Sequence, residues 1–360
     1  MKQFRLIISG GGTGGHIYPA LAIAKGLRKK YSDINILFVG AIGKMEMEKV
    51  PKEGFKIIGL WISGFKRSLS IKNLFFPIKT IFSIIHSLRI LKKFKPDIVV
   101  GTGGFASGPI LKVAQLLGLP TLIQEQNSYP GVTNRILSKN ANRICVAYEG
   151  LERYLPKKKI IITGNPIREN LTKIKIGSKA KLLFGLNPKM KTLVIIGGSL
   201  GSKRINQLIE KQKEFILKSG IQILWQCGSL YYNEYNNFES KEIVIRPYFD
   251  EMENVYAAAD FIISRAGAVS ISELSCVGKP LILIPSPNVT ANHQLKNAKA
   301  LSKANAAIMI RESELDKEFN KKFLLLISNI SKQKQLKNNL KKFAKPFATD
   351  DIINQIIELK

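Results

Sequence analysis

Short apolar runs rich in β-branched residues alternate along the chain with longer stretches whose apolar residues recur every three or four positions. The runs have the length and composition of buried strands, and the longer stretches have the period of amphipathic helices. Strands that alternate with helices predict an α/β fold built on parallel sheets. The predicted strands are 4–8, 34–39, 98–101, 121–123, 143–147, 160–163, 193–196, 223–226, 243–245, 261–264, 281–284 and 307–310.

Glycine-rich loops follow the strands 4–8, 98–101 and 193–196. In the first loop, Gly10, Gly12 and Gly15 fit the G-x-G-x-x-G fingerprint of dinucleotide-binding folds. An NAD or FAD site would also need an acid at the end of the next strand, but that strand ends in Gly40-Ala41. We therefore expect backbone amides that bind a phosphate, and no nicotinamide, flavin or other organic cofactor.

A further turn, Arg265-Ala266-Gly267, joins the strand 261–264 to a helical stretch. The unpaired amides of a first helical turn form an anion site, because the helix dipole adds to their attraction for negative charge. Glu273 lies on the same helix and could accept hydrogen bonds from the vicinal hydroxyls of a ribose. Phosphate on the amides and ribose on the acid together predict a nucleotide. The alternative is that Glu273 only stabilises the start of the helix, since Ser270 and Glu273 also fit the S-x-x-E capping box.

Each half of the 360-residue chain begins with a strand, a glycine loop and a helix, which predicts two Rossmann-like domains facing across a cleft. Glycine and proline in the stretch 164–168 suggest a hinge. The terminal stretch 350–359 has helical periodicity and could pack back on the first domain. The predicted domains are therefore 1–163 plus 344–360, and 164–343.

Composition narrows the class of protein. With 45% hydrophobic residues the chain can bury large cores, and its three scattered cysteines disfavour a disulfide framework or a zinc site. The start of the chain has no pattern of a signal peptide. A net charge of +30 favours anionic partners, and a general bias toward lysine is the alternative explanation for part of the excess. Nucleic acid is not expected as a partner, because no groove-reading or base-stacking signature accompanies the charge.

The stretch 74–91 is apolar but interrupted by Pro77, Lys79, His86 and Arg89, so it is not expected to span a bilayer. Aromatic and aliphatic residues flanked by cations are typical of a helix that lies on an anionic phospholipid surface. The alternative is an ordinary amphipathic helix packed on its own sheet. The apolar face would be Phe75, Phe76, Ile78, Phe82 and Ile85, with cations at Lys66, Arg67, Lys72, Lys79, Arg89, Lys92 and Lys93.

No metal site is expected. Mg²⁺ and Mn²⁺ prefer carboxylate ligands, and transferases that use them hold the ion with an Asp-x-Asp pair. The sequence has no such pair, and its nearest substitutes, Glu46-x-Glu48 and Glu251-x-Glu253, follow no glycine loop.

Seven motifs between residue 11 and about residue 300 together resemble the MurG family of peptidoglycan glycosyltransferases. They are GGTGGH, GTGGFASGP, QEQN, GNPIR, GGSLGS, RAGAVSISE and NHQLKNA. The resemblance implies the two-domain GT-B fold and inverting transfer of N-acetylglucosamine from UDP-N-acetylglucosamine to an undecaprenyl-linked muramyl-pentapeptide, lipid I to lipid II. It also implies a peripheral protein on the cytoplasmic face of the cell membrane, acting in cell wall synthesis.

By this resemblance the donor is held mainly by the second domain. Arg168 and Ser199 would approach the diphosphate, Phe249 the uracil, Glu273 the ribose and Gln294 the sugar. The phosphate turn would be lined by Ala268, Val269, Ser270, Ile271 and Ser272, and the first domain would add Thr13, Gly14, Gly15 and Asn127. The resemblance also implies that the first two glycine loops meet the diphosphate of the acceptor.

The transfer needs a base that accepts the proton of the acceptor hydroxyl. His16 and Glu125 are the candidates, and His16 could instead cap its helix or orient a loop. The sequence departs from the commoner family pattern at Gln124, Phe105 and Leu200. The alternatives in function are another UDP-sugar enzyme of the same fold, such as an epimerase, and a basic nucleic-acid-binding protein.

Overall fold

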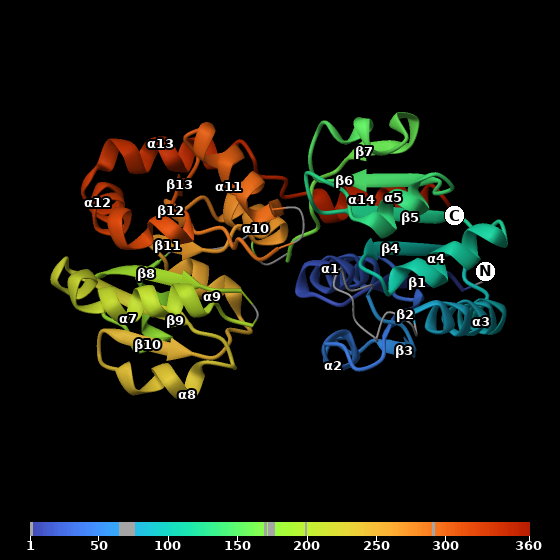
Figure 1. Ribbon diagram of the computed structural model, residues 1–360, viewed down its shortest axis with the longest axis horizontal. Helices are drawn as coiled ribbons and strands as arrows, with labels where there is room; N and C mark the ends of the chain where they lie inside the picture. The colour runs from blue at the N-terminus through green and yellow to red at the C-terminus, as the bar shows by residue number, and fades with distance from the viewer. Residues whose placement is uncertain (1–2, 65–75, 169–170, 172–176, 199, 290–291) are drawn as a thin grey trace. The chain divides into compact units, whose positions relative to one another are not determined.

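The structure is a computed structural model that describes residues 3–64, 76–168, 171, 177–198, 200–289 and 292–360 (Figure 1). The chain forms two compact units, Met1–Ile167 with Lys345–Lys360, and Arg168–Ala344. The boundary after Ile167 lies slightly beyond the predicted start of the second domain at residue 164, because residues 164–167 pack within the first unit. The Gly164 amide donates to the Val146 carbonyl over 3.1 Å, and the Asn165 side chain donates to the Gln126 carbonyl over 3.1 Å.

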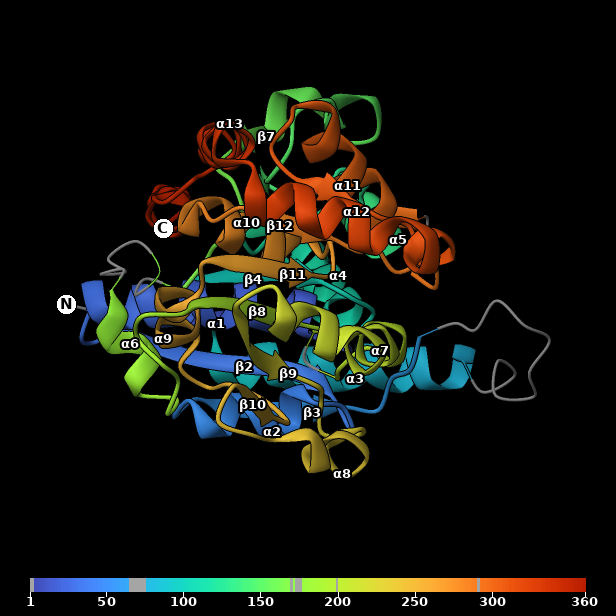
Figure 2. The same cartoon turned by 90° about the vertical axis from the view of Figure 1, so that its left-hand side faces the viewer.

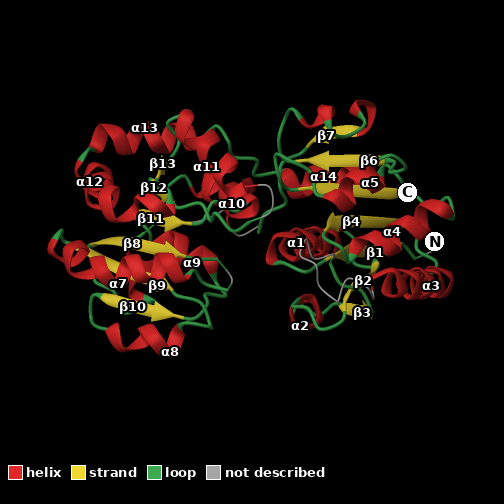
Figure 3. Cartoon of the chain, viewed as in Figure 1, coloured by secondary structure: helices red, strands yellow, loops and turns green. Residues whose placement is uncertain are grey.

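The first unit is built on a seven-stranded parallel sheet in the order β3-β2-β1-β4-β5-β6-β7 (Figure 3). Its strands are β1 (Arg5–Gly10), β2 (Asn35–Ala41), β3 (Lys56–Leu60), β4 (Ile98–Gly103), β5 (Thr121–Glu125), β6 (Arg143–Val146) and β7 (Ile160–Ile162). Its helices are α1 (Gly14–Lys30), α2 (Glu46–Lys52), α3 (Phe76–Phe94), α4 (Ser107–Leu116), α5 (Val132–Ser138) and α14 (Ala348–Ile357).

Alternate residues of these strands enter two cores, one on each face of the sheet. Ile7 and Val99 pack with α3, α4 and α5, whereas Leu6 and Ile8 pack with α1 and α14. The terminal helix α14 therefore covers the sheet of the first unit, where Ile352, Ile353 and Ile356 are fully buried.

The second unit repeats the plan with a six-stranded parallel sheet in the order β10-β9-β8-β11-β12-β13 (Figure 2). Its strands are β8 (Lys191–Ile196), β9 (Ile221–Gln226), β10 (Ile243–Arg246), β11 (Phe261–Ser264), β12 (Leu281–Leu283) and β13 (Ile308–Met309). Its helices are α6 (Ser178–Leu182), α7 (Lys203–Lys218), α8 (Tyr232–Tyr235), α9 (Met252–Ala258), α10 (Ala268–Val277), α11 (His293–Lys303), α12 (Leu315–Ser328) and α13 (Ile330–Lys341).

In each sheet the direction of strand progression reverses once, between β1 and β4 in the first unit and between β8 and β11 in the second. Ligands of open parallel sheets bind at the carboxyl ends of the strands beside such a reversal. The loops that follow these four strands are therefore the places to look for a site.

Candidate active site

The first glycine loop leads from β1 into α1, with Thr13 as the extended residue before the helix. No side chain caps this helix start, so the amides of Gly14 and Gly15 have no partner within the helix. The loop lies against the second glycine loop, because a Cβ atom at Gly104 would come within 2.3 Å of the Gly11 carbonyl oxygen. The two loops thus bring backbone amides to the carboxyl edge of the sheet.

His16 lies where these two loops meet. Its Nδ1 atom is 3.1 Å from the Gly11 carbonyl oxygen and 3.2 Å from the Thr13 hydroxyl. Because a carbonyl oxygen can only accept, this contact places the proton of neutral His16 on Nδ1 and the lone pair on Nε2. Burial lowers the pKa of His16, while the charges of Glu125 and Glu46 act in the opposite direction. His16 is therefore neutral near pH 7, as a base must be.

Glu125, the other predicted base, is buried at the end of β5, and both of its oxygens accept hydrogen bonds. The Asn127 amide and side chain donate to Oε1 over 3.0 and 3.2 Å. The Gly131 amide and the Asn134 side chain donate to Oε2 over 3.1 and 2.8 Å. These bonds hold the loop 126–131, so the geometry favours Glu125 as a positioning group and His16 as the base.

Glu46, the first residue of α2, is fully buried and organises the first glycine loop from a distance in sequence. Its carboxylate accepts from the Gly12 amide at 3.1 and 3.2 Å and from the Ala41 amide at 3.0 Å. In the sequence, Glu46 stands out only as part of the Glu46-x-Glu48 pair, which was not expected to hold a metal, and this contact was not predicted. A single acid opening a short helix gives no sign of the loop it contacts.

Gln124 and Gln126, at and just after the end of β5, are buried. Gln126 donates to the side chain of Gln124, which in turn donates to Asn165 over 3.0 Å. The network ties β5 to the end of the first unit and presents no free charge.

In the second unit, the turn after β11 begins α10 with the extended residue Gly267, and no side chain caps the helix. The amides of Ala268, Val269 and Ser270 have no partner within the helix, because the first internal bond runs from Ile271 to the Gly267 carbonyl. Ala268 and Ile271 point their side chains into the core, and the Ser272 hydroxyl donates to the Ala268 carbonyl over 3.1 Å. The backbone of this turn, rather than its side chains, can hold an anion.

Glu273 is 8% exposed and lies in the interior of α10. Because the helix starts at Ala268, Ser270 is not its cap, and the capping-box alternative is wrong. The Tyr256 hydroxyl donates to Glu273 Oε2 over 3.3 Å, and Arg168 Nε lies 3.7 Å from Oε1. Burial raises the pKa of Glu273, while Arg168 and Tyr256 oppose the rise. A buried acid so held is a common feature of functional sites.

Arg265 joins the loops that follow β8 and β11. It donates to the hydroxyl of Ser202, the residue that caps α7, and to the Ile284 carbonyl over 3.1 Å, and it pairs with Glu312. The turn at Arg265 was predicted from the sequence, but a role for the Arg265 side chain was not. Its contacts fix the positions of both loops beside the reversal of the sheet.

Three other predicted donor contacts have different outcomes. The Phe249 ring packs in the core, edge-on to Phe184 with centroids 5.7 Å apart. The Phe249 amide donates to Gln226, and the placement of Phe249 beside a uracil stays a prediction. Gln294 accepts from the Ser286 amide over 2.9 Å. Ser199 lies outside the described residues.

Comparison with known proteins identifies the family. The family model described as "Glycosyltransferase family 28 N-terminal domain" matches residues 6–146, and that of the C-terminal domain matches residues 192–352. A UDP-N-acetylglucosamine--N-acetylmuramyl-(pentapeptide) pyrophosphoryl-undecaprenol N-acetylglucosamine transferase from Flavobacterium psychrophilum is 53% identical over 362 residues, covering 100% of this chain and 98% of the relative. The chain belongs to the MurG family.

Further relatives agree with this assignment. The Cytophaga hutchinsonii protein of the same name is 51% identical over 359 residues, covering 99% of this chain and 97% of the relative. The crystal structure of Acinetobacter baumannii MurG has a TM-score of 0.75 and 26% identity, with 99% of each chain covered. The predicted GT-B fold and the predicted glycosyltransferase class are thereby confirmed.

Among the described residues, no group of three or more His, Cys, Asp or Glu side chains could hold a metal ion. The acids that the structure describes near the loops are engaged otherwise, since Glu46 and Glu125 accept backbone amides. The arrangement favours amides and cations as the partners of a phosphate.

The pKa of His16 should fall further in a Glu125→Gln variant, because the negative charge that favours the imidazolium is lost. Glu46→Gln should lower it less, since Glu46 is the weaker of the two charges acting on His16. Side-chain NMR titration can follow each of the three histidines. Glu48→Gln, on the exposed side of α2, is the matched control and should leave His16 unchanged. An unaltered His16 pKa in Glu125→Gln would contradict the proposed coupling.

Proposed function

We propose that this chain transfers N-acetylglucosamine from UDP-N-acetylglucosamine to undecaprenyl-pyrophosphoryl N-acetylmuramyl-pentapeptide, converting lipid I to lipid II in peptidoglycan synthesis. Identity of 53% over the full chain with a transferase of that name carries the proposal. The uncapped start of α10, with buried Glu273 on the same helix, supplies an anion site and an acid for a nucleotide.

The second unit holds the donor in this proposal. The diphosphate lies on the amides of Ala268, Val269 and Ser270, where unpaired N–H groups and the helix dipole stabilise the charge of the departing UDP. Glu273 accepts the ribose hydroxyls, and Arg168, 3.7 Å from Glu273, adds positive potential. Gln294 is proposed for the sugar, since its amide nitrogen makes no hydrogen bond to the described residues.

The first unit binds the acceptor and supplies the base. The amides of Gly14 and Gly15 suit a phosphate of the acceptor, as at other helix starts. His16 Nε2 takes the proton of the acceptor hydroxyl as oxygen attacks the anomeric carbon, and the bond to UDP breaks with inversion. The Gly11 carbonyl keeps Nε2 available by holding the proton on Nδ1.

A transfer assay tests the reaction. Labelled UDP-N-acetylglucosamine and lipid-linked muramyl-pentapeptide should give labelled lipid and UDP in equal amounts, and excess EDTA should not abolish the transfer. The main alternative in the same fold is a UDP-sugar epimerase. If the assay forms labelled UDP-N-acetylmannosamine and no labelled lipid, the protein is an epimerase and the proposed transfer is wrong.

We also propose that the chain is peripheral at the cytoplasmic face of the membrane and meets it through α3. No described helix is long and apolar enough to cross a bilayer. One side of α3 packs on the sheet through Ile90 and Leu91, as an ordinary amphipathic helix does. The other side nevertheless carries large exposed apolar residues, namely Ile78, Ile81, Phe82 and Ile85.

Trp61 extends this exposed surface, with its ring edge-on to Phe82 at 5.9 Å and Lys79 5.6 Å from its centroid. Ile81 and Trp61 were not in the predicted face. Phe75 of the predicted face lies outside the described residues, as do the predicted cations Lys66, Arg67 and Lys72. An aromatic and aliphatic surface beside cations suits the headgroup region of an anionic bilayer.

The double variant Ile81→Ser/Phe82→Ser should bind anionic liposomes roughly 30-fold more weakly, because burying such half-exposed side chains contributes about 1 kcal/mol each. Co-sedimentation with anionic and neutral liposomes over a range of salt measures this. Leu230→Ser, an exposed apolar residue of the second unit, is the control. If the α3 variant binds as tightly as the wild type, α3 does not contact the membrane. If the protein binds neutral and anionic liposomes equally, charge does not contribute to the binding.

A further inference from the structure

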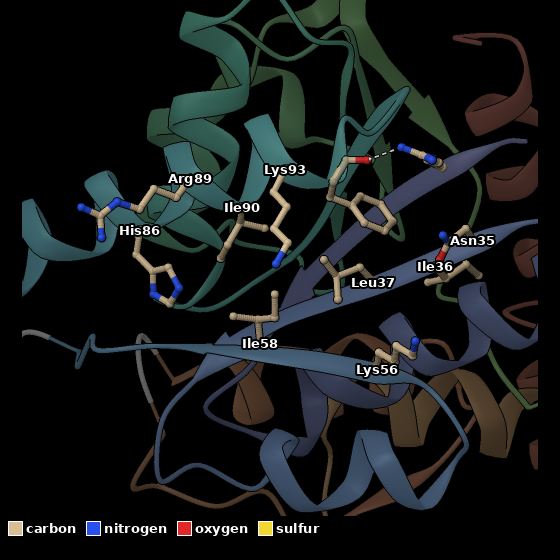
Figure 4. A pocket seen from close by; sticks show the side chains of 11 residues that line it. Asn35, Ile36, Leu37, Lys56, Ile58, His86, Arg89, Ile90 and Lys93 are labelled. Atoms are coloured by element: carbon tan, nitrogen blue, oxygen red, sulfur yellow. Dashed lines mark hydrogen bonds between the residues drawn. The ribbon is translucent and has the colours of Figure 1, made fainter. Parts of the chain in front are cut away.

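A pocket of about 700 Å³ lies at the amino ends of β1, β2 and β3, against the last turns of α3 (Figure 4). The strands are parallel, so this edge of the sheet is opposite to the edge that carries the glycine loops. Its lining includes Leu37, Ile58 and Ile90, which give it an apolar floor. None of the residues proposed for donor, acceptor or catalysis lines it.

The rim of the pocket is cationic. Arg5, Lys56, Arg89 and Lys93 contribute cationic side chains and His86 contributes an imidazole, and no acidic residue is among the lining residues. In Figure 4, Lys93 lies between Arg89 and Lys56 and directs its amine toward the strands. Lys56, Arg89 and Lys93 are exposed to water, and like charges gathered on one rim add their potentials and attract anions.

Three of these four cations have no acidic partner among the residues that the structure describes. Lys56, Arg89 and Lys93 form no ion pair with any residue that the structure describes. Arg5 is partly engaged, since its Nη1 donates to the Phe94 carbonyl over 3.1 Å. Its backbone amide donates to Asp97 over 2.8 Å, which puts one carboxylate behind the start of β1. Both contacts anchor Arg5 beside the pocket.

We propose that this pocket binds a phosphate-bearing anion, and that its source is the headgroup of an anionic phospholipid. Three or four guanidinium and ammonium groups suit phosphate oxygens, and the apolar floor suits the carbon skeleton next to them. On α3, Phe82, His86, Arg89 and Lys93 follow one another at intervals of three or four and therefore share a face. The pocket thus continues the exposed apolar surface of the same helix.

This inference goes beyond a general attraction to anionic membranes, because it assigns one ligand position at which two cations matter more than their neighbours. The test uses the full chain and soluble probes, so it does not depend on liposome binding or on transfer activity. Calorimetric titration would compare short-chain dihexanoyl phosphatidylglycerol, dihexanoyl phosphatidylcholine and inorganic phosphate, all below the micellar concentration.

Wild-type protein should bind the phosphatidylglycerol at least tenfold more tightly than the phosphatidylcholine. Arg89→Gln/Lys93→Gln should lose about tenfold or more of that affinity, since each removes a charge-assisted contact to phosphate. The matched control is Lys92→Gln/Lys95→Gln, which removes two exposed cations from the same end of α3 without altering the lining. It should change the affinity less than twofold.

The titration with inorganic phosphate tests whether the bound anion is a lipid headgroup or free phosphate. Weak phosphate binding with tight phosphatidylglycerol binding supports a lipid headgroup, whereas equal affinities support an anion site for free phosphate and overturn the lipid assignment. Equal losses in the two double variants, or equal binding of the two lipids, would overturn the site itself. Lys56→Gln, on β3 rather than α3, repeats the test if melting shows that the first pair of changes disturbs the helix.

Discussion

His16→Asn is expected to lower kcat by roughly 10²–10⁴-fold, the usual contribution of a general base. The amide of Asn can replace Nδ1 as a donor to the Gly11 carbonyl, but it offers nothing at the position of Nε2. Affinity for UDP and the melting temperature should therefore stay near the wild-type values. The transfer assay gives the rate, and calorimetry with UDP gives the affinity.

The pH profile separates a base from an orienting residue. Because burial lowers the pKa of His16 below its ordinary 6.5, wild-type kcat/KM should fall only as pH drops below that value, when the imidazole becomes protonated. His16→Asn should lack this acid limb. If Asn restores most of the rate, or if the limb persists in the variant, His16 acts by holding the loop rather than by taking the proton.

Most of the fold could be predicted from local patterns. Each of the predicted runs coincides with an observed strand, because buried parallel strands are short, apolar and β-branched. One observed strand, β3, was not predicted. Its edge position leaves its residues half-exposed, and its apolar run is interrupted by Gly59. The exposed face of α3 was identified only in part, since the pattern cannot tell Ile81 at the surface from Ile90 in the core.

The contacts of the candidate site could not be predicted in the same way, because they join residues far apart in sequence. Glu46 reaches Gly12 across 34 positions, and Tyr256 reaches Glu273 across 17. Local motifs also misled where they ignored helix boundaries, as the S-x-x-E pattern at Ser270 did. The sequence correctly predicted that the glycine turns follow the carboxyl ends of strands. Only the tertiary packing shows which acidic side chain holds which loop.

Glu273→Gln is expected to weaken UDP binding by about 10- to 150-fold, because a charge-assisted hydrogen bond to ribose contributes on the order of 1.5–3 kcal/mol. Glutamine preserves the shape of the side chain. It can still accept a hydrogen bond from the Tyr256 hydroxyl, which lies 3.3 Å from the carboxylate in the wild-type protein. Alanine is the less suitable change, because it is expected to destabilise the fold. It would strip Tyr256 and Arg168 of a buried partner, and breaking such a pair costs roughly 3–5 kcal/mol when fully buried, less here because Arg168 is partly exposed.

Comparing UDP with 2′-deoxy-UDP connects the loss of affinity to the ribose itself. Wild-type protein should bind the deoxy ligand more weakly than UDP, whereas Glu273→Gln should bind the two almost equally, since the partner of the missing hydroxyl is already weakened. Tyr256→Phe is the structural control, because it removes one hydrogen bond from Glu273 but keeps the charge. It should lower the melting temperature while retaining the preference for UDP. A Glu273→Gln protein that still discriminates as strongly as wild type would show that Glu273 supports α10 and that the ribose is bound elsewhere.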